Sequence, residues 1–197
     1  MSVLIRILAG FAGLFIVLLG IGALLPDAVH VERSIEIPAA PATVYPHIAN
    51  LQSFYGWSTL PHQRPQEKPV WSGPESGVGA TMEWGGPDTG KGIQSITETE
   101  EPTLITMAVD FYEYGEAKLR FTLKPTERGT LVVWEFLSPI RDTSPFGRWA
   151  GIFVERAIGP NYEQALDNLK RLVAADTHKV GPVPTPSDSN SNPDHAE

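Results

Sequence analysis

The segment SPFGRWAGIFVERAIGPNYEQALDNLKRLVA, residues 144–174, predicts a long helix around which a folded domain is built. Ser144 is a typical N-cap residue, and Pro145 at the first helical position lacks an N–H that would need a partner. Apolar side chains then recur at steps of three and four residues, the pattern of a helix with one buried face. Because Gly159 and Pro160 interrupt this pattern, we expect either a kink or two abutting helices there.

Upstream of this helix, segments of alternating apolar and polar residues predict strands. Two short helices are predicted after the first strand, in residues 41–51 and 51–57. Short turns between successive strands require antiparallel pairing. We therefore predict an α+β fold in which a curved antiparallel sheet of about seven strands surrounds the C-terminal helix. The strand segments are residues 29–37, 70–72, 80–84, 92–100, 104–112, 117–123 and 131–137.

The N-terminal segment is apolar enough to cross a membrane. Residues 7–25 carry no charge, and at 1.5 Å per residue they span about 28 Å, close to the hydrocarbon thickness of a bilayer. A cleaved secretory signal is the alternative, because Arg6 supplies a short basic region before the apolar run. The run is longer than usual for a signal, and residues 24–27 offer no small-x-small cleavage site. We therefore expect an uncleaved transmembrane anchor.

The two ends of the chain set the predicted domain boundaries. The anchor occupies residues 1–28, the folded domain residues 29–175 and a disordered tail residues 176–197, because the last segment is polar and rich in proline. Arg6 precedes the span, whereas acidic residues follow it. The positive-inside rule then places the N-terminus in the cytoplasm and the domain on the outer side of the membrane.

Composition and motifs exclude several classes of function. The net charge of -8 argues against nucleic-acid binding, and the absence of cysteine excludes disulfides, thiolate zinc sites and cysteine nucleophiles. Gly92 stands where a phosphate-binding loop needs Ser or Thr after Lys91, and no G-x-S-x-G hydrolase motif occurs. The histidines form no ligand pair at helical or strand spacing. We therefore predict no metal and no cofactor.

Four segments carry a resemblance to a known family: VERSIEIPAAPATVYPHIANLQSFYGW (31–57), GVGATMEW (77–84), GTLVVWEF (129–136) and GPNYEQALDNLKRLV (159–173). With the order of the elements, they resemble the START-like or helix-grip superfamily (SRPBCC), which includes the polyketide cyclase/dehydrase and lipid-transport family. The resemblance covers residues 31–173. It implies a cavity between the sheet and the C-terminal helix, whereas a membrane anchor is not part of the usual family pattern.

Large aromatic and methionine side chains are the candidates to line such a cavity. Each could equally pack a filled core, but the resemblance favours a cavity for the set. The predicted ligand-binding residues are Trp57, Trp71, Met82, Trp84, Met107, Phe111, Trp134, Phe136, Phe153 and Tyr162.

Three functions follow, in order of preference. The first is a membrane-tethered binding domain for a hydrophobic small molecule or lipid. The second is a non-catalytic interaction domain with a filled core. The third is an enzyme of the cyclase or dehydratase type, for which Asp110 with Tyr112 is the weak candidate acid–base pair. Glu83 and Glu135 alternate with apolar residues and are expected to face solvent. No particular oligomeric state is predicted.

Overall fold

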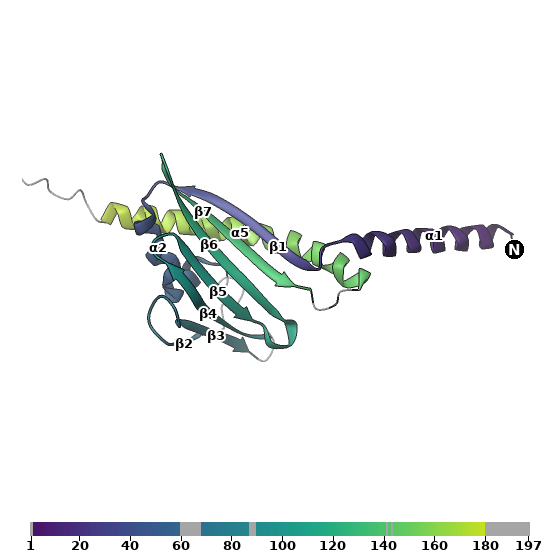
Figure 1. Cartoon of the computed structure of the whole chain (residues 1–197), viewed down its shortest axis with the longest axis horizontal. Helices are drawn as coiled ribbons and strands as arrows, with labels where there is room; N and C mark the ends of the chain where they lie inside the picture. Colours follow the sequence, from purple (N-terminus) through teal and green to yellow (C-terminus); the bar gives the residue numbers. More distant parts are fainter. Residues whose placement is uncertain (1, 60–67, 87–89, 141, 143, 180–197) are drawn as a thin grey trace, which may run out of the picture.

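The computed structural model describes residues 2–59, 68–86, 90–140, 142 and 144–179 (Figure 1). Its helices are α1 (Ser2–Leu24), α2 (Pro41–Ala49), α3 (Leu51–Trp57) and α5 (Pro145–Lys179), with a 3-10 turn η1 (Tyr112–Tyr114). Its strands are β1 (Ala28–Ile37), β2 (Val70–Ser72), β3 (Thr81–Gly86), β4 (Gly90–Glu100), β5 (Leu104–Asp110), β6 (Glu116–Thr126) and β7 (Gly129–Pro139).

The strands form one antiparallel sheet in the order β1-β7-β6-β5-β4-β3-β2. The first strand closes against the last, from the pair Ala28↔Pro139 to the pair Ile37↔Thr130. The sheet curves, and α5 lies across its concave face (Figure 1). The predicted helix-grip α+β fold is confirmed.

Strict alternation in the central strands explains why the sheet has one buried face. Along β6, Ala117, Leu119, Phe121 and Leu123 are buried, and the residues between them are exposed or half-buried. Strand β7 follows the same rule. A period of two places every second side chain on the same face of a sheet. The buried face meets the apolar stripe of α5, whose most buried residues are Ala165, Leu166, Leu169 and Val173.

Of the two alternatives expected at Gly159 and Pro160, two abutting helices are wrong, because α5 continues through both residues as one helix. Proline lacks the N–H that would bond the carbonyl of Arg156, so the helix loses one internal hydrogen bond there. Packing against β1 holds both halves in one helix. The guanidinium of Arg33 in β1 lies where a Cβ on residue 159 would stand, and its Nε donates to Glu163 Oε1 at 2.8 Å.

The two ends of the chain are both helical where the structure describes them. Residues 25–27 alone separate α1 from β1. Helix α1 contains a 22-residue stretch, Val3–Leu24, that is long and apolar enough to cross a membrane, and 6% of its most apolar window is buried. Helix α5 extends to Lys179, into the segment predicted as a tail. The remainder of that segment, residues 180–197, lies outside the described residues.

Candidate functional site

A cavity of about 230 Å³ lies between the sheet and α5. Most of the side chains that line it are aromatic or aliphatic, which is the usual composition of a small-molecule site. Its volume is below the roughly 300–1,000 Å³ that is typical of sites for drug-sized ligands. The lining residues are Phe54, Ser58, Thr59, Trp84, Gln94, Val109, Phe111, Leu119, Trp134, Phe136, Ile158, Asn161 and Tyr162.

The cavity occupies the half of the sheet that is nearest to α1. The pair Ala28↔Pro139 marks the end of the sheet next to the linker from α1. From there the register places the lining residues Phe136, Leu119 and Val109 on neighbouring strands of the same half. A ligand in the cavity would therefore lie near the end of the domain to which the C-terminal end of α1 is attached (Figure 1).

Aromatic rings form one wall of the cavity. Tyr162 of α5 stacks on Trp134 of β7, with ring centroids 3.9 Å apart and planes 8° apart. Trp134 in turn stacks on Phe121 at 4.8 Å, and Phe136 meets Tyr162 edge-on at 6.1 Å. Such pairs contribute about 0.5–1.5 kcal/mol each beyond the burial of their area. The wall is therefore a rigid, apolar surface shared by the sheet and α5.

The position of Trp84 depends on a glycine. Gly92 lies directly opposite Trp84 in the β3–β4 register, and a Cβ on Gly92 would collide with the indole ring. The missing side chain lets the ring lie flat over the neighbouring strand. Trp84 there meets Phe111 edge-on at 6.2 Å. The apolar lining at this end of β3 thus follows from a residue that has no side chain.

Six of the lining residues carry a polar side-chain group, namely Ser58, Thr59, Gln94, Trp134, Asn161 and Tyr162. Gln94 is 2% exposed, and its amide donates to Met107 Sδ at 2.9 Å. Within the described residues, the indole Nε1 of the buried Trp134 has no hydrogen-bond partner. Burial raises the pKa of the Tyr162 phenol well above its usual value. Tyr162 therefore stays protonated at neutral pH, as a hydrogen-bond donor and not as a base.

The structure places half of the ten predicted ligand-binding residues in the cavity wall, namely Trp84, Phe111, Trp134, Phe136 and Tyr162. Met82 and Met107 are fully buried but do not line the cavity. Trp57 is also buried in the core, where its Nε1 donates to the carbonyl of His47 at 2.9 Å. These three side chains fill space that the sequence pattern alone does not distinguish from a cavity wall.

Trp71 and Phe153 lie away from the cavity. Trp71 packs edge-on against Tyr55 at 5.8 Å and lines a separate groove on the outside of the domain. Phe153 is 66% exposed, although it belongs to the helical pattern of α5. Phe153 lies in the part of α5 next to α1, where it lines a groove between the two helices.

Sequence reasoning missed the other lining residues, and some of them carried a signal. Phe54 belongs to the predicted helix 51–57, which is rich in aromatic residues and also contains Trp57. Gln94 occupies a buried position of β4, where a lone polar residue among inward-facing positions is informative. Ile158 and Asn161 flank the Gly159–Pro160 step of α5 and carried no such signal.

The candidate acid–base pair lies outside the cavity wall. Asp110 follows Val109, which lines the cavity, so the pleat of β5 directs Asp110 to the opposite face of the sheet. Asp110 Oδ1 accepts a hydrogen bond from the backbone N–H of Tyr112 at 2.6 Å. Tyr112 is 46% exposed and has a positive φ of 54°. The two residues thus form a turn at the end of β5, with the carboxylate serving as its cap.

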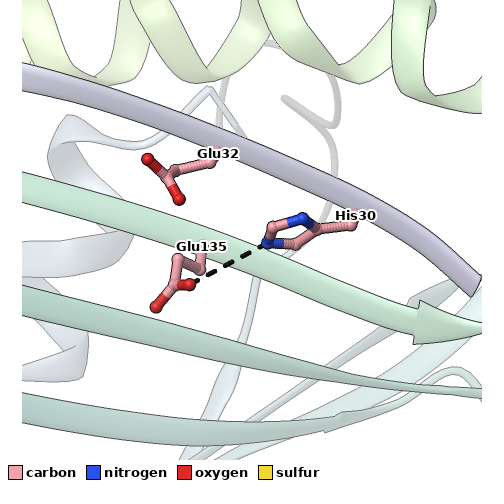
Figure 2. Close-up of side chains that lie close together, drawn as sticks. All are labelled: His30, Glu32 and Glu135. Carbon is pink, nitrogen blue, oxygen red and sulfur yellow. Dashed lines mark ion pairs between the residues drawn. The ribbon is translucent and has the colours of Figure 1, made fainter.

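The outer face of the sheet carries a cluster of possible metal ligands that sequence spacing did not indicate. One ligand atom from each of His30, Glu32 and Glu135 lies within 4.8 Å of the others (Figure 2). His30 Nε2 is 3.9 Å from Glu135 Oε1, and its side chain is 54% exposed. Arg120 stands opposite Glu135 in the β6–β7 register. A neighbouring cation reduces the affinity of such carboxylates for a metal ion, and solvated clusters of this kind are common without one.

A second hollow lies between α3 and α5 and is larger but more open to solvent. It has a volume of about 480 Å³ and is lined by Ser53, Gly56, Trp57, Asn168, Arg171 and Leu172. It lacks the aromatic enclosure of the inner cavity. The inner cavity is therefore the better candidate for ligand binding, although it is smaller.

The comparisons with known proteins agree on the fold. A sequence profile described as "Polyketide cyclase / dehydrase and lipid transport" matches residues 28–174. Among curated proteins, none shows significant sequence similarity to this chain. Solved structures that share the fold have low sequence identity to it, and at this level a likeness indicates fold alone.

Three of these structures illustrate the range. A protein of unknown function from Staphylococcus aureus, SA2116, has a TM-score of 0.60 and 12% identity, covering 77% of this chain and 97% of its own. The di-domain ARO/CYC StfQ from the steffimycin biosynthetic pathway has a TM-score of 0.55 and 13% identity, covering 77% and 52%. A protein from Rhodobacter sphaeroides has a TM-score of 0.53 and 18% identity, covering 75% and 93%.

Proposed function

This chain belongs to the polyketide cyclase/dehydrase and lipid transport family, and we propose that it is a membrane-tethered domain that binds a hydrophobic small molecule or part of a lipid. The observation that carries the proposal is the aromatic cavity in the half of the sheet next to α1. At about 230 Å³, the cavity fits one compact ring system or a short length of acyl chain, but not a whole phospholipid.

The residues of the cavity wall favour binding over acid–base catalysis. Among the described lining residues, Tyr162 is the only one with a titratable side chain, and its raised pKa keeps it protonated. Proton transfer from carbon needs a base with a pKa near the operating pH, which a buried phenol does not supply. Gln94, Trp134 and Tyr162 can instead orient one oxygen atom of a bound molecule by hydrogen bonds.

The tether is supported by the contacts of α1 with the domain. Arg148 Nη1 donates to the carbonyls of Ala23 at 2.9 Å and Leu25 at 2.7 Å, and these carbonyls lie at the C-terminal end of the helix. Carbonyls at a helix end need such partners, because no further turn supplies their donors. A segment that signal peptidase removed would not keep these contacts. They support an anchor that is retained in the mature protein.

The proposal is tested by narrowing the cavity and measuring binding. The full chain, purified in phospholipid nanodiscs, is titrated with a hydrophobic fluorescent probe such as N-phenylnaphthylamine. Val109→Phe places a larger side chain in the cavity wall. Ala108→Phe is the control, because it places the same phenylalanine side chain on the exposed face of the same strand. We expect Val109→Phe to abolish most probe binding and Ala108→Phe to leave it unchanged.

Two further measurements make the result decisive. Circular dichroism and thermal unfolding establish whether Val109→Phe folds. Gln94→Met is a second variant of the cavity lining, in which the new side chain has a volume similar to that of glutamine. Native mass spectrometry of the wild-type protein from cells identifies the bound compound by mass. Equal probe binding by the wild type and a folded Val109→Phe variant would contradict the proposal.

A further inference from the structure

The first turn of α5 lies beside α1, and the next turn approaches the start of the sheet through Gly151, which is buried against Val29 and Ile140. Trp149 Nε1 donates a hydrogen bond to the carbonyl of Leu18 at 3.1 Å. Gly22 lies so close that a Cβ there would stand 2.8 Å from Pro145 Cβ and 2.9 Å from Trp149 Nε1. Together with the bonds of Arg148 to Ala23 and Leu25, these contacts fix the start of α5 against the C-terminal half of α1.

The contact lies well inside the apolar stretch of α1. At 1.5 Å per residue, Leu18 is about 9 Å before the end of the helix at Leu24. If α1 spans the bilayer with Leu24 at its edge, the carbonyl of Leu18 and the indole of Trp149 lie about 9 Å inside the hydrocarbon. At that depth the hydrogen bond to Leu18 supplies the partner that the indole N–H would otherwise lack in lipid.

An apolar groove opens between the two helices at this level. It has a volume of about 310 Å³ and is lined by Phe15, Leu18, Leu19, Trp149 and Phe153. Phe153 is 66% exposed, and Phe15 is 51% exposed. A large exposed aromatic side chain in an apolar groove is unfavourable in water, but it is stabilised by contact with lipid.

The charges near the groove are consistent with burial in lipid. Arg148 is the only charged residue among residues 145–153, and its guanidinium bonds the end carbonyls of α1 at the level expected for the headgroups. Further along α5, charged residues recur from residue 155 onward. The part of α5 that lies beside α1 therefore carries a single charged residue, Arg148, at the headgroup end of the contact.

We propose that the first turns of α5, with Trp149 and Phe153, insert into the leaflet on the domain side, and that an acyl chain of a bilayer phospholipid occupies the groove against α1. This inference rests on the membrane anchor of the proposed function. It adds a second point of lipid contact, and along α5 this point is only about 7.5 Å from Ile158 at the cavity wall. A lipid in the groove would lie beside the end of the domain that contains the cavity.

The test uses the full chain, which has no native cysteine to interfere with labelling. Phe153→Cys carries a bimane fluorophore in phosphatidylcholine vesicles that contain nitroxide-labelled acyl chains. Leu14→Cys, on the exposed surface of α1, is the reference within the lipid, and Lys170→Cys, exposed further along α5, is the reference in water. Quenching by the acyl-chain nitroxide is compared with quenching by aqueous iodide.

We expect the label at Phe153→Cys to lose most of its emission to the acyl-chain nitroxide and little to iodide, as at Leu14→Cys. The label at Lys170→Cys should show the reverse. If Leu14→Cys is quenched by the nitroxide and Phe153→Cys only by iodide, the anchor stands and this inference is wrong. If Leu14→Cys also responds only to iodide, α1 is outside the bilayer, and both proposals fail.

A second copy of the chain is the competing occupant of the groove. In that case unlabelled Phe153→Cys would form a cross-linked dimer under mild oxidation, and the bimane label would be shielded from both quenchers. That result would overturn the assignment of the groove to lipid. Thermal unfolding of each cysteine variant checks the fold, which we expect to be unchanged because all three side chains are exposed.

Discussion

The phenol ring of Tyr162 lies parallel to the indole ring of Trp134, with ring centroids 3.9 Å apart. The first residue belongs to α5 and the second to β7, so the stack joins the helix to the sheet at the wall of the cavity. Trp134 also meets Phe54 of α3 at 6.0 Å. One aromatic layer thus links three elements that are far apart in the sequence.

Truncation of Tyr162 should reduce stability much more than removal of its hydroxyl. Tyr162→Ala deletes the ring that stacks on Trp134, and for a half-buried ring we expect a loss of about 2–4 kcal/mol in the free energy of unfolding. Tyr162→Phe keeps the stack and should change this free energy by less than about 1 kcal/mol. Urea unfolding of both variants measures the difference. Equal losses would show that the hydroxyl, and not the stack, stabilises the domain.

Stability should fall in alkaline solution because of the same residue. Burial raises the pKa of Tyr162 in the folded state, whereas in the unfolded chain the pKa stays near 10. The folded state therefore disfavours the phenolate. Below about pH 10 this residue does not reduce the free energy of unfolding. Above that pH, the free energy of unfolding decreases by up to about 1.4 kcal/mol per pH unit. Tyr162→Phe should be less sensitive over this range in urea unfolding, and an unchanged slope would contradict the assignment.

Two helical glycines should respond differently to a methyl group. In Gly159→Ala the new Cβ occupies the place of the Arg33 guanidinium, so the ion pair with Glu163 is displaced. Its loss costs up to about 1 kcal/mol and offsets the gain in helix propensity, so we expect no net stabilisation. In Gly56→Ala the new Cβ meets nothing within 4 Å, and alanine should stabilise α3 by about 0.5–1 kcal/mol. Thermal unfolding of the two variants tests the pair, and a stabilised Gly159→Ala would be inconsistent with the contact.

The packing of α5 on α1 should depend on one glycine of the apolar helix. Gly22→Leu introduces a side chain where Pro145 and Trp149 now lie, and we expect the start of α5 to separate from α1. Gly20→Leu adds the same side chain where nothing lies within 4 Å. In nanodiscs, limited proteolysis near residue 145 should accelerate for Gly22→Leu alone. Equal cleavage of the two variants would rule out this contact.

Replacement of Gln94 should alter ligand preference more than stability. Its amide donates to a sulfur atom, which is a weak acceptor, so Gln94→Leu should change the free energy of unfolding by less than about 1.5 kcal/mol. The variant also lacks a polar group in the cavity wall. A probe with a carbonyl oxygen should therefore bind more weakly, while a purely apolar probe binds as before. Fluorescence titration with both probes measures the change.

The fold was predictable because its signals are local. Alternation in residues 117–123 and 131–137 assigns the buried face of β6 and β7, and Ser144–Pro145 marks the region where α5 begins. The continuity of α5 through Pro160 was not predictable from these signals. It depends on packing against β1 and on Arg33, which lies far away in the sequence.

The candidate site was predictable only in part, because an aromatic residue in a buried position has the same local pattern whether it fills a core or lines a cavity. Trp84 follows the alternation of its predicted strand, and Trp57 lies in the predicted helix 51–57. Both are buried aromatic positions, yet only Trp84 lines the cavity. Phe153 follows the stripe of α5 but lies beside α1. His30 and Glu135 meet only through the pairing of the first strand with the last, which sequence spacing does not reveal.

The three residues between α1 and β1 restrict where this domain can operate. Fully extended, residues 25–27 reach about 10 Å, far less than the distance between two separate membranes. If α1 spans a bilayer and the domain binds a hydrophobic molecule, as proposed, a domain held this closely would exchange that molecule only with the bilayer that holds it or with a protein that comes to it. A transfer assay should therefore show no movement between distinct vesicle populations unless a second, mobile component is added.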